Sequence, residues 1–440
     1  MIFKLEPRAQ AFSKTFVKRI TTLGLLASLV IPALHAAEAR IWTSRKGTSL
    51  EAELIRFDDK NEKSKTVTLL NTKDRKEMVL PMVELSIADR EFLVETAGAD
   101  PKILIEGEAG QPEKQVKIET NTFKKLKPSP LLFDTDSESD YDILESEHFI
   151  IATAGEPRPQ PIAETAERMW HGMAFQHMNF RRDWGDKKMV IMVVGKADVY
   201  TRLGKWYMAQ LKKAGKDDDA ARLAALWERV SGAGVELTPE MTEKMNCFPD
   251  APVFNVKPDQ AHLFKKEMGP FIVHCIADTL LDRQMGNIAS YGVKGLFAVS
   301  KGHAYYKEIS LTGKSETAMV SASGSDNSFV KENKGYGEAS EWAKTLKSEV
   351  KKGTTKLSLG TMFGWDNDSL KPNQLAVMYS FSYYMQSTPA RQAGYAALIR
   401  RIESSKQIPV PDEIASIFGF PNAAAFEADW KLFVTEGPFK

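Results

Sequence analysis

Residues 268–309 decide the fold, and they read MGPFIVHCIADTLLDRQMGNIASYGVKGLFAVSKGHAYYKEI. Apolar residues recur at helical spacing in the first half, until Gly286 interrupts the pattern. The same spacing resumes after the loop and continues to the end of the stretch. The apolar residues are Phe271, Val273, Ile276 and Leu280 in the first half, then Leu296, Phe297, Val299 and Tyr305 in the second. The stretch therefore predicts two helices joined by a short loop, with a histidine near the start of the first.

Two helices of this kind, the first opening with a histidine, resemble the core of the peptidase MA-like (gluzincin) family. That family has H-E-x-x-H on its first helix and, after a short loop, a motif close to W-L-N-E-G-L-A on the second. Residues four apart share one helical face, so the two histidines can bind one zinc ion, and the second helix supplies a glutamate. The resemblance implies a larger α+β domain that is zincin-like, with a helical C-terminal half.

The chemical positions of the family pattern are changed in this chain. His274 occupies the first ligand position, Cys275 that of the general-base glutamate, and Asp278 that of the second histidine. In residues 291–298, which align with the second motif, Lys294 takes the place of the ligand glutamate. Zinc hydrolases need about three ligands and a base for the bound water, and an ammonium group repels the metal. We therefore expect a degenerate metal site with no catalytic residue, no bound metal and no cofactor.

An ion pair is expected to occupy the position of the lost metal. A partly buried Asp278 carboxylate needs a positive charge, and Lys294 on the second helix has a stem long enough to supply it. The alternative is that Lys294 extends into solvent and Asp278 caps a local turn.

The segments around this core extend the resemblance to about residues 141–436. Residues 147–153 (EHFIIAT) and 188–194 (KMVIMVV) predict strands on either side of an amphipathic helix, as the family shows before its zinc helix. Residues 252–256 predict a further strand, which corresponds to the strand along the substrate cleft of metallopeptidases. Five helices are predicted near the C-terminus, at residues 338–350, 372–386, 389–404, 411–418 and 422–434.

Residues 40–96 predict a small β-rich unit followed by a short helix that Ser86 caps. The order of core and turn residues resembles the SLA-homology domain (type 1), an SH3-like barrel that binds short peptides in endocytic adaptors. The matching residues include Arg40, Trp42, Gly47, Ala52, Val67, Leu69, Pro81 and Asp89. The resemblance implies peptide binding through Trp42 and its neighbours; the alternative is that Trp42 only closes the barrel core.

Residues 98–140 are rich in proline, lysine and acidic side chains and predict a linker. Its acidic end, residues 134–145, superficially fits a calcium loop, but Ser139 stands where the sharp turn requires glycine. A solvated acidic linker is the favoured interpretation. The expected organisation is a signal peptide at 1–36, the barrel at 37–97, the linker at 98–140 and the peptidase-like domain at 141–437.

The N-terminus has a basic region ending at Arg19, an apolar run over residues 20–34, and small residues from Ala36. This pattern predicts a secretory signal cleaved near Ala36 or Ala37, with an uncleaved anchor as the alternative. We therefore expect an exported protein, periplasmic or extracellular, with no stable membrane span after cleavage. The two cysteines, Cys247 and Cys275, can form a disulfide there or remain separate thiols.

Charge and composition restrict the function. The chain of 440 residues has net charge +1, and residues 1–36 carry five basic groups and one acidic group, which leaves −3 for the remainder. This balance argues against a nucleic-acid partner, which a strongly basic domain would indicate. The favoured hypothesis is an exported non-catalytic protein that binds a protein or peptide through the barrel and a pseudo-peptidase domain. The alternative is a metal-dependent hydrolase in which His274 and Asp278 bind the metal with His262, His303 or Glu308.

Overall fold

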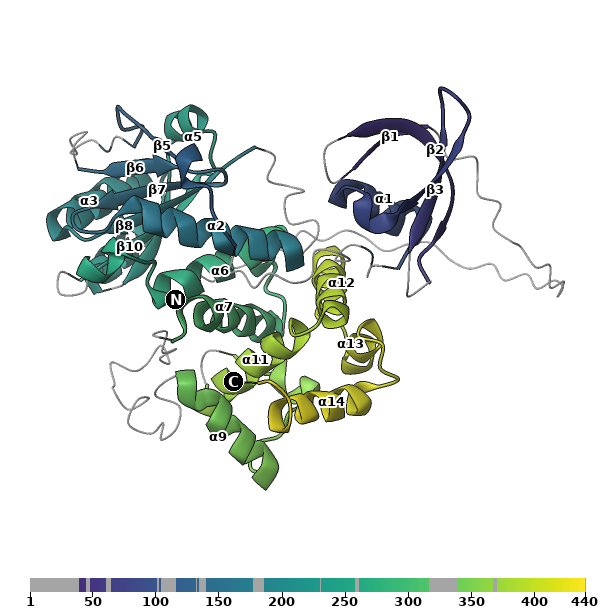
Figure 1. Ribbon diagram of the computed structural model, residues 1–440. Helices are drawn as coiled ribbons and strands as arrows, with labels where there is room; N and C mark the ends of the chain where they lie inside the picture. The colour runs from purple at the N-terminus through teal and green to yellow at the C-terminus, as the bar shows by residue number, and fades with distance from the viewer. Residues whose placement is uncertain are drawn as a thin grey trace, which may run out of the picture. The chain divides into compact units, whose positions relative to one another are not determined.

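The computed structural model describes residues 39–44, 48–60, 65–100, 103, 116–131, 133, 140–176, 186–229, 231–257, 261–315, 339–366 and 370–439 (Figure 1). The expected signal segment 1–36 and residues 134–139 of the acidic run, Ser139 among them, lie outside the described residues. The chain divides into two compact units, residues 1–106 and 107–440, and each is described by itself. Within the described ranges, no helix has the length and apolar character that crossing a membrane requires.

The first unit is a four-stranded antiparallel meander that curves around one helix (Figure 1). Its elements are β1 (Arg40–Thr43), β2 (Ser49–Asp58), β3 (Thr66–Asn71), β4 (Glu77–Pro81), the short helix η1 (Met82–Glu84) and α1 (Ile87–Ala97). A bridge between Ser44 and Leu85 joins the end of β1 to the chain after β4. The expected cap is confirmed, because the Ser86 hydroxyl accepts a hydrogen bond from the backbone N–H of Asp89 at 3.2 Å.

A fully buried arginine ties this unit to residues that the sequence assigned to the linker. The guanidinium of Arg90 donates from Nε to the Leu85 carbonyl at 3.1 Å and from Nη1 to the Ile103 carbonyl at 3.2 Å. Ile103 itself is completely buried. The barrel unit therefore continues past residue 97, and the start of the predicted linker is wrong.

The second unit contains a six-stranded mixed sheet with the strand order β5-β6-β7-β8-β10-β9. The strands β7, β8 and β10 are parallel, whereas β5, β6 and β9 run antiparallel to their neighbours. The strands are β5 (Lys124–Lys125), β6 (Asp142–Glu145), β7 (Phe149–Ala154), β8 (Met189–Val194), β9 (Gly232–Glu236) and β10 (Asp250–Asn255). Because β5 pairs with β6, and Leu131 and Phe133 are buried in the core, the predicted linker is also wrong over this part.

Both faces of the sheet are covered. In β8, Met189, Ile191 and Val193 point into one apolar core, while the alternate residues Val190, Met192 and Val194 point into the other. All six side chains are inaccessible to solvent, which explains why the strand is a continuous apolar run in the sequence.

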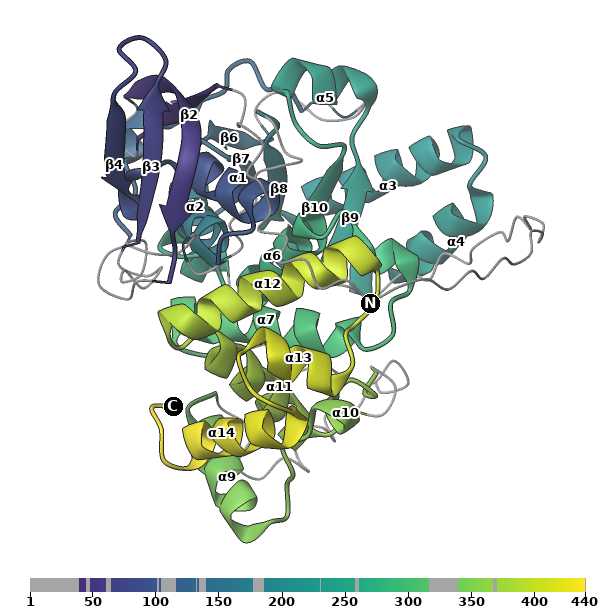
Figure 2. The same ribbon diagram turned by 90° about the vertical axis from the view of Figure 1, so that its right-hand side faces the viewer.

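The helices of this unit are α2 (Pro159–Gln176), α3 (Ala197–Lys213), α4 (Asp217–Leu226), α5 (Pro239–Met245), α6 (Pro270–Gln284), α7 (Leu296–Thr312), α9 (Ala339–Lys352), α10 (Leu359–Met362), α11 (Pro372–Met385), α12 (Pro389–Ser405), α13 (Pro411–Ile417) and α14 (Ala423–Thr435). Figures 1 and 2 show α6 and α7 between the sheet and the C-terminal helices. The predicted α+β class is confirmed, as are the paired central helices and the five helices near the C-terminus. The core of the unit is built around α6 and α7.

Candidate functional site

The helix α6 begins where the sequence puts a glycine before a proline. Gly269 is the extended residue before the helix, and Pro270 occupies the first turn, where a missing N–H has no cost. His274 and Asp278 follow on one face of α6, one turn apart. His274 is buried and Asp278 is half-buried, so both side chains are directed toward the neighbouring α7 rather than into solvent.

A glycine allows α7 to lie close against α11. A Cβ atom added to Gly302 would come within 2.5 Å of the Met378 carbonyl oxygen and 2.9 Å of the Ser382 hydroxyl. Such contacts cannot be accommodated without moving backbone, so residue 302 has to be glycine in this packing. The residue before it, Lys301, is thereby held at the interface with α6.

The Asp278 carboxylate is bound by two side chains of α7. The Ser300 hydroxyl donates to Oδ1 at 2.5 Å, and the Lys301 ammonium lies 2.5 Å from Oδ2. Burial by itself would raise the pKa of Asp278, but the Lys301 charge and the two hydrogen bonds outweigh it and lower that pKa to about 2. Asp278 is therefore ionised and paired at the meeting point of the two helices.

The cation of this pair is not the one that the sequence indicated. Lys294 is exposed and lies before the first residue of α7, whereas the side chain of Lys301 is 9% exposed. The predicted ion pair between Asp278 and Lys294 is therefore wrong, and Lys301 is the cation that pairs with Asp278.

The remaining histidine of the motif makes a second buried contact. Nδ1 of His274 lies 3.0 Å from Oε2 of Glu308, and the two side chains are 3% and 0% exposed. The ring of Tyr305 packs edge-on against the imidazole, with 4.6 Å between ring centroids. His274 is thus held by a carboxylate from the same helix that supplies Lys301.

Of the alternative metal ligands, His303 and Glu308 lie on α7, while His262 is exposed on the short helix η6 (Ala261–Lys265). The Tyr395 hydroxyl and Nδ1 of His303 are 3.2 Å apart, and burial lowers the pKa of His303 to about 3. Across the described ranges, no three His, Cys, Asp or Glu side chains are grouped so that they could hold a metal ion.

Cys275, which the sequence comparison places where a general base would be expected, lacks the properties of a base. Burial raises the pKa of its thiol to about 12, so the sulfur carries a proton at neutral pH. Cys247 and Cys275 are both free thiols, which decides between the two interpretations of the cysteines.

Comparison of the chain with protein-family models, with curated proteins and with solved structures finds no match. The resemblance to peptidase MA-like proteins and to the SLA-homology domain stays a prediction from the sequence.

Trp42, the peptide-binding candidate of the barrel, belongs to its core. The side chain is 2% exposed, and its indole N–H donates to the Ala52 carbonyl at 3.1 Å. Phe92 packs edge-on against the ring, and the Arg40 guanidinium lies 4.8 Å from its centroid. The prediction that Trp42 contacts a peptide is therefore wrong for this side chain, and the alternative of a core tryptophan is confirmed.

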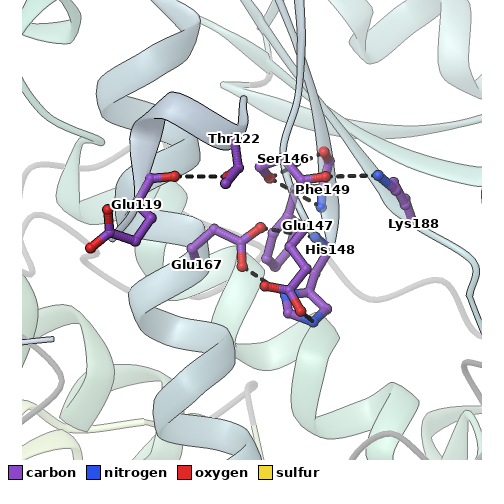
Figure 3. A network of polar contacts seen from close by, with 8 residues as sticks. All are labelled: Glu119, Thr122, Ser146, Glu147, His148, Phe149, Glu167 and Lys188. Atoms are coloured by element: carbon purple, nitrogen blue, oxygen red, sulfur yellow. Dashed lines mark hydrogen bonds and ion pairs between the residues drawn. The ribbon is translucent and has the colours of Figure 1, made fainter. Parts of the chain in front are cut away.

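A second buried polar network lies at the start of β7, in the segment EHF (Figure 3). Glu167 of α2 accepts from the backbone N–H of His148 at 2.9 Å, and its other oxygen lies 2.7 Å from the imidazole Nδ1. Burial raises the pKa of Glu167, but the contacts with His148 outweigh it and leave that pKa below its ordinary value. The His148 ring stacks on Trp170 at 3.9 Å, so this network fastens α2 to the sheet.

A groove that the sequence did not indicate lies between the edge of the sheet and the start of α6. Its cavity has a volume of about 610 Å³, and three phenylalanines, Phe254, Phe264 and Phe271, form part of its wall. Leu263 lies in the same wall and is 48% exposed. The signal in the sequence was weak, because β9 reads GAGVE and contains two glycines.

Proposed function

We propose that this is an exported, non-catalytic protein that binds protein or peptide ligands, with a pseudo-peptidase as its larger unit. The observation that carries the proposal is the ion pair between Asp278 and Lys301. In the parent family this point holds a zinc ion, and here an ammonium group supplies the positive charge instead. A metal-dependent hydrolase built on His274 and Asp278 is disfavoured because Lys301 already binds the Asp278 carboxylate and Cys275 is not a base.

The edge strand β9 supports binding of an extended chain. The Pro249 carbonyl accepts from Leu237 N–H, and the Ser231 carbonyl accepts from Asn255 N–H. In an antiparallel pair every second residue bonds to the partner strand, so these two bonds show which residues of β9 face β10 and which face away. In this alternation Gly232 and Gly234 direct their N–H and C=O groups away from β10. Pro252, opposite Gly234, has no N–H to offer, in agreement with that register. Among the described strands β9 is the last of the sheet, so these groups are placed to pair with an added strand.

The groove beside β9 would give such a ligand its side-chain preference. Its phenylalanine wall favours an apolar side chain, and Lys257, Glu267 and Lys314 add charged groups to the lining. In the barrel unit, we assign the proposed binding to exposed residues on the outer surface and not to Trp42, which is buried. Ile41 and Val79 are 65% and 59% exposed on its strands.

The test uses dephosphorylated casein, an unfolded polypeptide, as the probe in fluorescence anisotropy. We expect binding without cleavage, and Gly234→Pro is expected to weaken it about tenfold because the substitution removes an outward N–H. Gly234→Ala is the matched control, since a Cβ there meets no atom within 4 Å, and it should leave the affinity unchanged. Equal binding by the two variants, or casein cleavage by the unmodified protein, would refute the proposal.

A further inference from the structure

A second cavity lies at the opposite edge of the same sheet. It has a volume of about 590 Å³ and is formed by the β5 and β6 segments, the start of α2 and one residue of η6. Its apolar lining includes Leu126, Ile143, Leu144, Pro159 and Pro161. The size is that of a small-molecule pocket, far larger than a single inorganic ion needs.

The charged residues of this cavity are mostly basic. Lys125, Lys127, Arg158 and Lys265 line it, all four exposed to solvent, and Asp142 is the acidic residue of the lining. Lys265 is paired with Glu156 at 2.8 Å. Within the part of the chain that the structure describes, the other three basic groups form no ion pair. The cavity therefore presents a positive charge that its own carboxylates do not neutralise.

Protection of a sheet edge explains only part of this charge. Lysines on an edge strand such as β5 prevent unwanted strand pairing, which accounts for Lys125, whereas Lys127 lies two residues beyond the strand. Arg158 precedes α2 and Lys265 belongs to η6, so neither lies on the edge strand, yet both line the same cavity. Convergence of cations from three separate segments over an apolar floor requires another explanation.

Side chains, rather than the helix end, supply the attraction for an anion. The first turn of α2 contains Pro159 and Pro161, and both lack the N–H that a helix terminus offers to an anion. The aligned peptide dipoles of this 18-residue helix still favour negative charge at its start.

We propose that this cavity binds a short acidic peptide, with carboxylates at Lys127 and Arg158, beside the ion pair of Lys265 with Glu156, and an apolar side chain against the apolar lining. The site is separate from the groove at β9 and does not depend on the function proposed for that groove. Carboxylates are the expected acidic groups because the apolar lining favours a ligand that also has a hydrocarbon part, which a peptide has and an inorganic anion does not.

Calorimetric titration of the full chain with two tripeptides tests the proposal: N-acetyl-Glu-Leu-Glu amide and N-acetyl-Gln-Leu-Gln amide. We expect the acidic peptide to bind at least about tenfold more tightly at low salt, and added salt to weaken it. The triple variant Lys127→Gln/Arg158→Gln/Lys265→Gln should weaken binding of the acidic peptide about tenfold or more.

The matched control removes three exposed lysines of α3, as Lys205→Gln/Lys212→Gln/Lys213→Gln, and should leave the affinity nearly unchanged. If both triple variants lost affinity for the acidic peptide equally, net charge alone would explain the loss, and the assignment of the peptide to this cavity would be overturned. Equal affinity of the unmodified protein for the two peptides would overturn it as well. Displacement by sodium phosphate at the same affinity would instead assign the site to phosphate. Loss of binding in Gly234→Pro would place the peptide at β9 and refute a separate site.

Discussion

Replacing Lys301 by methionine is expected to lower the free energy of unfolding by about 3–5 kcal/mol. The substitution leaves the Asp278 carboxylate at the interface of α6 and α7 without its cation, and Lys301 itself is 9% exposed. Methionine keeps most of the apolar stem, so the loss reports on the charge rather than on a cavity. Urea denaturation at neutral pH, followed by circular dichroism, measures it.

Lys294→Met provides the matched control, because this lysine precedes α7 and is exposed. It should change stability by less than about 0.5 kcal/mol. Asp278→Asn alone is expected to destabilise as well, and the double variant Asp278→Asn/Lys301→Met should lose less than the sum of the two. Additive losses would show that the two residues are not coupled, contrary to this account.

The same pair gives stability a definite dependence on pH. The folded-state pKa of Asp278, about 2, lies below the ordinary value of 3.8. The stabilisation is therefore fully present above pH 3.8 and is lost as the pH falls through 2. In the Lys301→Met variant, the loss of stability that accompanies protonation of Asp278 should disappear.

Glu167→Ala is expected to destabilise the protein by a similar amount, about 3–5 kcal/mol. The carboxylate is 2% exposed, and its removal deprives both the buried backbone N–H and the imidazole of His148 of their acceptor (Figure 3). Thermal or urea unfolding of the full chain gives the measurement. Glu167→Gln, which keeps one acceptor oxygen, should lose less.

Glu164→Ala is the control on the same helix, since Glu164 is partly exposed and lies 3.6 Å from Arg168. A surface pair of this kind contributes at most about 1 kcal/mol. Equal losses for Glu164→Ala and Glu167→Ala would contradict the role assigned to the His148 network.

The sequence was sufficient where apolar periodicity is strong. The paired helices α6 and α7, the buried strands β7 and β8 and the C-terminal helices follow from the spacing of their apolar residues. The ion pair was anticipated from the need of a buried carboxylate for a cation, but its partner was not. Lys294 and Lys301 lie seven residues apart. Because α7 begins at Leu296, Lys294 precedes the helix, whereas Lys301 lies within it and pairs with Asp278.

The rest depends on long-range contacts that no local pattern encodes. β5 has two residues, both lysine, and exists because Lys125 pairs with Leu144 across the sheet. β9 contains glycines that reduce strand propensity, yet its pairing with β10 creates the groove of the proposed binding site. In the barrel, Trp42 is buried where β1 pairs with β2, and its indole N–H donates to the Ala52 carbonyl of that strand.

Metal content and peptidase activity of the full chain, measured on the same preparation after incubation with zinc and dialysis, test the central claim most directly. We predict zinc far below one ion per chain and no cleavage of casein, because Lys301 already binds the carboxylate of Asp278, one of the candidate metal ligands. About one zinc per chain, lost together with casein cleavage in His274→Ala, would contradict the proposal that this unit is a pseudo-peptidase.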